Sequence, residues 1–280
     1  MSKILPTLVI AATGKTGRRV ASRLEAMGNP VRRASRSTGT RFDWNDRTTW
    51  GPALEGVGGV YVVYSPDLAV PAAPAHIADF VAMAKAAGVE RLVLLSGRGE
   101  EEAQRCERIV QGSDIAWTII RASWFAQNFD EGAFVEPVLA GEVALPAADV
   151  LEPFIDIEDI AEIAAEALTD TRHAGQLYEV TGPRLMTFGE AVAEIAAATG
   201  RSITYTTIGR EAFVAGLRGA ALPEDQVGLL DYLFTTVLDG RNAHTTDGVQ
   251  QALGRPARDF SDYARRTAAQ GRWNAITQDA

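Results

Sequence analysis

The sequence predicts an α/β protein with a Rossmann-type, doubly wound parallel sheet and a smaller C-terminal substrate-binding lobe. A short apolar run, Leu8 to Ile10, ends in a turn of small residues, and an amphipathic segment follows at once. This is the strand–turn–helix opening of a dinucleotide-binding unit. Strand-like and helix-like segments then alternate through the first half of the chain, which indicates a mainly parallel sheet. The strand at 92–95 is apolar throughout, as expected when helices cover both faces.

The individual elements follow from local patterns. Gly28 and Gly88 stand just past two helical segments, where helices commonly end. We expect strands at 7–11, 31–35, 40–42, 59–64, 91–95 and 116–120, and helices at 15–28, 48–56, 74–88 and 100–112. After Arg121 the rhythm changes. Residues 122–150 are expected to form a loop-rich excursion, followed by a helix at 158–168, a strand at 176–181, a helix at 187–199 and a mostly helical remainder.

The first turn is predicted to hold a pyrophosphate. Gly14 lets the backbone approach the anion, and Gly17 lets the helix lie against the strand. The free N–H groups and the positive end of the helix then bind the negative charge. The spacing is A-x-x-G-x-x-G, so Ala11 stands where the first glycine is usual. The expected contacts are Thr13, Gly14, Lys15, Thr16 and Gly17.

The end of the second strand favours NADP over NAD. NAD sites usually carry an acid about 20 residues beyond the glycines. Here that position holds Arg36, between Ser35 and Ser37. A guanidinium can grip a 2′-phosphate that a carboxylate would repel. The alternative is that Arg36 and its neighbours Arg32 and Arg33 are ordinary solvated charges.

Other strand ends supply further candidates. Asp43 and Trp44 could meet the adenine, or could be a strand-end acid and a lid-forming ring. Tyr64, Ser65 and Pro66 follow one strand and Ser96 follows the next. These four are expected to flank the ribose and nicotinamide, with Tyr64 and Ser96 as catalytic candidates. Plain turn chemistry is the alternative.

The aromatic residues after the sixth strand could form a substrate site. Trp124 and Phe125, together with Asn128 and Phe154, are expected to face the substrate, because aromatic rings can wall a flat pocket. Equally, these rings could be the core of the second lobe. We therefore expect an NADP-binding Rossmann domain at 1–150, with its sheet completed by 151–181. A substrate lobe at 151–280, with discontinuous boundaries, would close over the carboxyl edge of the sheet.

Composition excludes several other classes of protein. The chain has 280 residues, 46% of them hydrophobic, and a net charge of −9, which suits a sizeable core and argues against direct nucleic-acid binding. His76, His173 and His244 lie far apart, so no metal site is expected. The single Cys106 permits no internal disulfide and fits a reducing cytoplasm. No segment resembles a signal peptide or a membrane span, and we expect a cytoplasmic monomer or homodimer.

One expected catalytic pair is missing. Ordinary short-chain reductases place a Lys four residues after a Tyr that protonates the carbonyl oxygen. The helix predicted after Ser96 has neither residue between Gly99 and Arg108, so a ketone reductase would lack its general acid here. An iminium becomes a neutral amine on hydride addition, and water could protonate the phenolate of a reduced quinone. Neither acceptor needs the missing acid.

Several of these segments match a known family. With them the sequence resembles the NmrA-like group of atypical short-chain dehydrogenases over nearly its full length. The motif ASRS at 34–37, followed by RFDW at 41–44, is similar to the ergot alkaloid dehydrogenase branch, which implies iminium reduction by NADPH without a Tyr/Lys pair. The segments that carry the resemblance are ATGKTG at 12–17, ASRS at 34–37, WTIIR at 117–121, WFAQNF at 124–129 and FIDIEDIA at 154–161.

We therefore expect an NADPH-dependent oxidoreductase that transfers hydride to a small planar electrophile, an imine/iminium or a quinone. The resemblance also implies an alternative, because the group contains non-catalytic regulators that sense dinucleotide and bind a protein partner. A scaffold with a vestigial site is a third possibility. Two departures from the group are Ala11 in the first turn and the helix after Ser96, which lacks the Lys or His of many NmrA-like reductases.

Overall fold

The computed structural model describes residues 4–274. The chain divides into two compact units, and each is described by itself. Unit 1 is Met1–Ala122, Ile157–Val180 and Asp247–Arg255, and unit 2 is Ser123–Asp156, Thr181–Thr246 and Pro256–Ala280.

Unit 1 is built on a seven-stranded sheet with the order β3-β2-β1-β4-β5-β6-β8. Every neighbouring pair is parallel. The chain runs outward from β1 to β3 and then crosses to β4 on the other side of β1, so the sheet is doubly wound. This confirms the Rossmann-type sheet. The strands are β1 (Thr7–Ile10), β2 (Val31–Ser35), β3 (Thr40–Arg41), β4 (Gly59–Val62), β5 (Arg91–Gly97), β6 (Ala116–Ala122) and β8 (Gln176–Val180).

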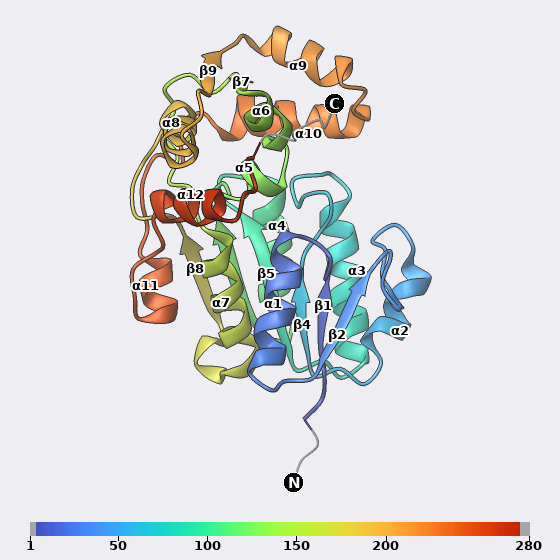
Figure 1. The fold of residues 1–280 in the computed structure, drawn as a ribbon. Coiled ribbons are helices and arrows are strands. Elements are labelled where there is room, and N and C mark those ends of the chain that lie inside the picture. The colour runs from blue at the N-terminus through green and yellow to red at the C-terminus, as the bar shows by residue number, and fades with distance from the viewer. Residues whose placement is uncertain (1–3, 275–280) are drawn as a thin grey trace. The chain divides into compact units, whose positions relative to one another are not determined.

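Helices cover both faces of this sheet (Figure 1). On the face drawn toward the viewer α1 packs against α7, and on the other face α3 packs against α4. Strand residues Leu8, Val60 and Leu92 share a core with Phe80 of α3 and Cys106 of α4, because alternate strand side chains point to one face. The helices are α1 (Lys15–Ala26), η1 (Arg47–Thr49), α2 (Trp50–Leu54), α3 (Ala73–Ala86), α4 (Glu101–Gln111), α7 (Ile157–Thr169), η2 (Thr171–His173) and α11 (Gly248–Leu253).

Unit 2 is mainly helical around an aromatic core. Phe129, Phe134, Phe188 and Phe260 are buried in one cluster with Trp273. A small parallel sheet pairs β7 (Glu142–Leu145) with β9 (Thr204–Thr207). The helices are α5 (Asn128–Glu131), α6 (Val135–Ala140), α8 (Phe188–Thr199), α9 (Arg210–Gly219), α10 (Glu224–Tyr232), the π-helix η3 (Leu233–Val237) and α12 (Phe260–Ala269).

The expected elements differ from the observed ones mainly in unit 2. In unit 1 the elements lie where they were expected, within a few residues at each end; the expected helix at 48–56 is a short 3-10 turn followed by α2. The excursion at 122–150 contains two short helices and β7, and the remainder expected to be mostly helical contains β9. Each of these strands has four residues, too few to establish an alternating pattern in isolation.

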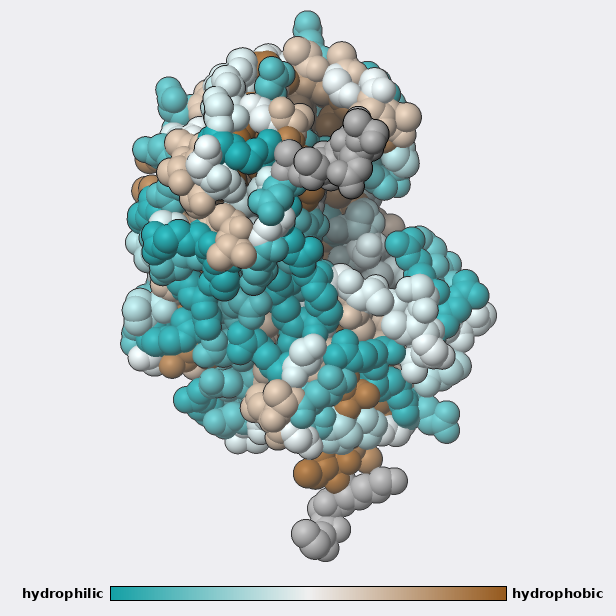
Figure 2. All heavy atoms as spheres, in the orientation of Figure 1, coloured by the Kyte–Doolittle hydropathy of each residue, from teal (hydrophilic) through white to brown (hydrophobic). Residues whose placement is uncertain are grey.

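The surface of the protein carries both hydrophilic regions and a few exposed apolar side chains. The face shown in Figure 2 is largely hydrophilic over α1 and α7. Among the described residues, the large apolar side chains that stay exposed are Ile4, Leu5, Met27 and Leu151. No helix within residues 4–274 has the length and apolar character that a membrane crossing requires.

Candidate functional site

The turn between β1 and α1 has the geometry of an anion cradle. Ala11 adopts a left-handed φ of 53°, and the Gly14 N–H donates to the Ala11 carbonyl at 2.8 Å. A Cβ on Gly17 would lie 2.2 Å from that same carbonyl oxygen, so only glycine lets the helix start this close to the strand. Within the described residues no side chain caps α1 and no acid stands in its first turn. The helix N-terminus therefore remains suited to a phosphate.

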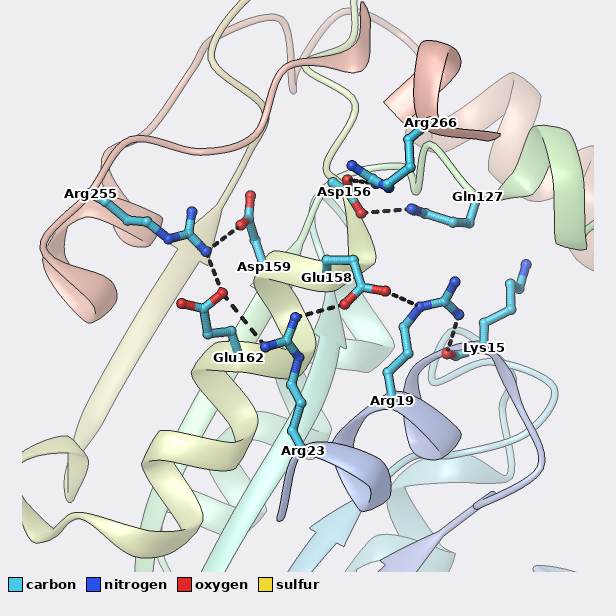
Figure 3. A network of polar contacts seen from close by, with 10 residues as sticks. All are labelled: Lys15, Arg19, Arg23, Gln127, Asp156, Glu158, Asp159, Glu162, Arg255 and Arg266. Atoms are coloured by element: carbon cyan, nitrogen blue, oxygen red, sulfur yellow. Dashed lines mark hydrogen bonds and ion pairs between the residues drawn. The ribbon is translucent and has the colours of Figure 1, made fainter. Parts of the chain in front are cut away.

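A group of ion pairs fixes α1 against α7 (Figure 3). Glu158 on α7 accepts hydrogen bonds from Arg19 at 2.6 Å and from Arg23 at 2.7 Å. Arg19 also donates to the carbonyl of Lys15 at 2.9 Å, in the first turn of α1. These bonds therefore connect the N-terminal turn of α1, which forms part of the cradle, to α7 of the same unit. Arg255 extends the group through Asp159 and Glu162 of α7.

The end of β2 forms a compact turn of hydroxyl groups. The Ser37 N–H donates to Ser35 Oγ at 3.1 Å, and the Ser35 N–H donates to Thr38 Oγ1 at 2.7 Å. Arg36 is exposed, and it makes no hydrogen bond or ion pair with the described residues. Its guanidinium is therefore available to a phosphate. Sequence reasoning missed Thr38, although the Ser-Arg-Ser-Thr run was a signal for a polar turn.

The two arginines within β2, Arg32 and Arg33, both bind other groups of the protein. Arg32 donates to the carbonyls of Ala53 and Glu55. Arg33 is ion-paired with Glu25 on α1 at 2.8 Å. Of the three arginines in this segment, Arg36 alone fits the expected role toward a 2′-phosphate.

Asp43 and Trp44 lie in very different environments. Trp44 is 4% exposed, and its indole N–H donates to the Val63 carbonyl at 3.0 Å. Its ring packs on Tyr64 and Phe42, so the ring belongs to the core. This burial argues for a packing role and against contact with adenine. Asp43 is partly exposed, and its Oδ1 accepts a hydrogen bond from the Asn45 N–H at 3.0 Å, which stabilises the turn that follows β3.

The loop after β4 divides into a buried and an exposed part. Tyr64 is 7% exposed, and its hydroxyl group is hydrogen-bonded to His76 Nδ1 on α3 at 2.8 Å. Burial raises the pKa of Tyr64. Ser65 and Pro66, joined by a cis peptide bond, are exposed. His76 was not expected here, because its link to Tyr64 depends on how α3 packs against the sheet.

Ser96 belongs to a buried polar cluster at the end of β5. Its hydroxyl donates to Glu107 on α4 at 2.6 Å, and Arg121 on β6 donates to the same carboxylate. Arg121 also reaches Glu179 of β8, which pairs with buried Arg98. These bonds join the ends of β5, β6 and β8. Ser96 is 4% exposed, which argues for a structural role beside the site.

The expected substrate residues all lie in unit 2. Phe154 is 2% exposed and packs in the aromatic core against Phe188, so its burial argues for a packing role. Trp124, Phe125 and Asn128 are partly exposed. The ring of Trp124 stacks on Phe134 with centroids 6.3 Å apart. In the same unit Gln127 and Arg266 both donate to Asp156, each at 2.6 Å (Figure 3).

The part of the chain that the structure describes contains no group of three or more His, Cys, Asp or Glu residues that could hold a metal ion. Cys106 is buried, and burial raises the pKa of its thiol to about 12. A thiol in this state is a packed side chain and a poor nucleophile.

Comparison with known proteins decides the family. The (4-alkanoyl-5-oxo-2,5-dihydrofuran-3-yl)methyl phosphate reductase of Streptomyces griseus subsp. griseus is 31% identical over 281 residues, which cover 92% of this chain and 96% of the relative. The festuclavine dehydrogenase of Aspergillus fumigatus is 28% identical, over 95% of this chain and 98% of the relative. The chain belongs to the NmrA-like atypical short-chain dehydrogenases. No family model matches the sequence.

A solved structure agrees with the fold of this family member. The NADPH-dependent quinone oxidoreductase of Escherichia coli, solved with NADPH, superposes with a TM-score of 0.78 at 21% identity. The match covers 93% of this chain and 99% of that structure. It confirms the Rossmann-type α/β architecture that the first strand–turn–helix unit predicted.

Proposed function

We propose that the chain reduces a small planar electrophile, an iminium or a quinone, with NADPH. As a member of its family the chain is an oxidoreductase of the NAD(P)H-dependent kind. The observation that carries the choice of cofactor is Arg36, exposed beside the Ser35–Ser37 turn while both neighbouring arginines are engaged. The names of two similar proteins support this choice: one is a festuclavine dehydrogenase, and the other is an NADPH-dependent quinone oxidoreductase.

The residues of unit 1 would hold the cofactor in three places. Backbone from Thr13 to Gly17, at the N-terminus of α1, would bind the pyrophosphate. Arg36, Ser35 and Ser37 would bind the 2′-phosphate. Asp43 would approach the adenine, and the loops after β4 and β5, with Tyr64, Ser65, Pro66 and Ser96, would surround the nicotinamide end. When bound, NADPH supplies the hydride.

The substrate side would use the partly exposed residues of unit 2. Trp124 and Phe125 offer ring surface to a planar acceptor, and Asn128 can donate or accept a hydrogen bond. An acceptor that needs no strong acid at the moment of hydride transfer fits the absence of a Tyr/Lys pair from α4.

A panel of acceptors tests this proposal. NADPH oxidation would be followed at saturating cofactor with a cyclic iminium, a quinone and a ketone of similar shape. A missing general acid costs about 10²–10⁴ in rate, so the ketone should be slower by roughly that factor. A ketone as fast as the other two would contradict the proposal. Tight NADPH binding without turnover of any acceptor would favour a dinucleotide-sensing regulator.

A further inference from the structure

A further arginine lies beside the serine turn at 35–37 that is proposed to hold the 2′-phosphate. Arg41 is the last residue of β3, and Ser35 is the last residue of β2. The two residues are paired in the parallel ladder, and the Phe42 N–H donates to the Ser35 carbonyl at 2.9 Å. Both strands therefore end side by side at the carboxyl edge of the sheet, where open α/β sheets bind their ligands.

The side chain of Arg41 lies on the same face of the sheet as the hydroxyl group of Ser35. Directly paired residues of a ladder point to one face, and successive residues of a strand alternate between the faces. Phe42, which follows Arg41, is buried in the same core cluster as Ala34, which precedes Ser35. Arg41 and Ser35 therefore both point to the opposite face, so Arg41 emerges beside the serine turn.

Arg41 is exposed and only loosely held by the protein. Its side chain is 64% exposed, and among the described residues its ion-pair partner is Asp46, with an N–O distance of 3.7 Å. This distance is too long for a hydrogen bond. Asp46 Oδ1 accepts from the Thr48 N–H at 3.2 Å and from the Thr48 hydroxyl at 2.5 Å. Hydrogen bonds from Thr48 lower the pKa of Asp46 most, and the charge of Arg41 contributes less. Exposed ion pairs of this kind contribute little, so Arg41 can exchange its partner at low cost.

A 2′-phosphate is a better partner for Arg41 than Asp46 is. A phosphate group carries nearly two negative charges and three acceptor oxygens at neutral pH. Arginine binds such a group through two parallel N–H bonds, which are stronger than a single long contact with a carboxylate. Arg36 supplies only one positive charge, so a second guanidinium group would complete the neutralisation.

We propose that Arg41 is a second binding residue for the 2′-phosphate of NADPH and contacts it from the strand next to Arg36. The inference rests on the function proposed above, from which it takes the cofactor. Binding of the phosphate would replace the contact between Arg41 and Asp46, so Asp46 competes with the cofactor for Arg41. NADH has no 2′-phosphate and would leave the ion pair in place. Arg41 and Asp46 therefore both contribute to the choice between NADPH and NADH.

Two adenosine nucleotides isolate this contact from catalysis. Adenosine 2′,5′-bisphosphate and 5′-AMP differ only in the 2′-phosphate, and calorimetry measures both affinities without an acceptor. Arg41→Ala should weaken binding of the bisphosphate about five- to tenfold, because the contact is charged but exposed. It should leave binding of 5′-AMP unchanged, which also shows that the variant is folded.

Arg105→Ala is the matched control for the loss of a positive charge. The Arg105 side chain is 57% exposed and ion-paired with Glu102 on its own helix, so its environment is similar to that of Arg41. The control should change neither affinity. A loss of bisphosphate binding as large as that of Arg41→Ala would reveal a general effect of net charge and would overturn the proposal.

A substitution of the competing acid should have the opposite effect. Asp46→Asn removes the negative charge and keeps an oxygen that can accept from Thr48. It should tighten binding of the bisphosphate by about two- to fivefold and leave 5′-AMP unchanged. The gain should disappear when Asp46→Asn is combined with Arg41→Ala, because the two residues act through one contact. A gain that persists in the double variant would overturn the competition for Arg41.

The wild-type affinities separate this role from the proposed function. A wild type that prefers the bisphosphate, together with an Arg41→Ala variant that keeps the full preference, would overturn the role of Arg41 alone. Equal wild-type affinities for the bisphosphate and 5′-AMP would contradict the assignment of NADPH itself, and the role of Arg41 would fall with it.

Discussion

At the end of β2, three arginines of one short segment differ in what they contact. Arg32 and Arg33 are held by backbone carbonyls and by Glu25, while Arg36 is exposed beside the serine turn. Arg36→Ala should weaken NADPH binding and spare NADH, which has no 2′-phosphate. Loss of one charge-assisted contact costs roughly 1.5–3 kcal/mol, or about ten- to a hundredfold in affinity. Titration of the wild type and of Arg36→Ala with NADPH and with NADH measures this loss of affinity. Arg33→Ala is the matched control and should leave NADPH affinity unchanged, and equal wild-type affinities for NADPH and NADH would contradict the assignment.

The two glycines of the first turn should respond differently to substitution. A Cβ on Gly14 would lie 3.2 Å from the carbonyl oxygen of Ala11, and a small shift of the backbone can relieve this close contact. A Cβ on Gly17 would lie only 2.2 Å from the same oxygen. Gly14→Val should therefore fold, as circular dichroism would show, but bind neither NADPH nor NADH. Gly17→Ala should reduce stability itself, seen as a lower unfolding midpoint. Normal NADPH binding by Gly14→Val would mean that this turn is not the pyrophosphate cradle.

At the scale of elements, α1 depends on α7 through Glu158. Burial raises the pKa of Glu158, but hydrogen bonds from Arg23 and Arg19 outweigh it and hold the pKa below the usual value. A carboxyl group with a lowered folded-state pKa stabilises the protein above its unfolded-state pKa, and this contribution is lost as the pH falls through the folded value. Glu158→Gln should cost about 1–2 kcal/mol near pH 7, since its bonds are charged but partly exposed. The difference from wild type should shrink below about pH 4. Urea unfolding at both pH values tests this, and a pH-independent difference would contradict it.

How far the sequence predicts the structure also differs between elements. The alternation of apolar strands and amphipathic helices identified the sheet of unit 1, because each of those patterns is local. β7 and β9 have four residues each and stabilise one another only through pairing far apart in the sequence, so neither could be predicted alone. Burial of Trp44 and Phe154 likewise depends on distant rings.

Unit 1 of the molecule has the sheet and first turn of a dinucleotide-binding unit, and unit 2 is rich in buried aromatic residues. An enzyme and a dinucleotide-sensing regulator could share the cradle at α1 and the arginine at the end of β2. They differ in whether hydride leaves the cofactor. Binding measurements cannot distinguish them, because both proteins would prefer NADPH. A measurement that follows the transfer of hydrogen from C4 of the nicotinamide to an acceptor distinguishes the enzyme from the regulator.

The most direct test is therefore hydride transfer from NADPH deuterated at both C4 positions, with a cyclic iminium as acceptor. Mass spectrometry of the amine product measures the transfer. A hydride-transferring reductase would place one deuterium at the former iminium carbon, in an amount equal to the NADPH oxidised. An iminium left unreduced by a protein that binds NADPH tightly, or an amine without deuterium, would contradict the claim that this chain is a hydride-transferring reductase.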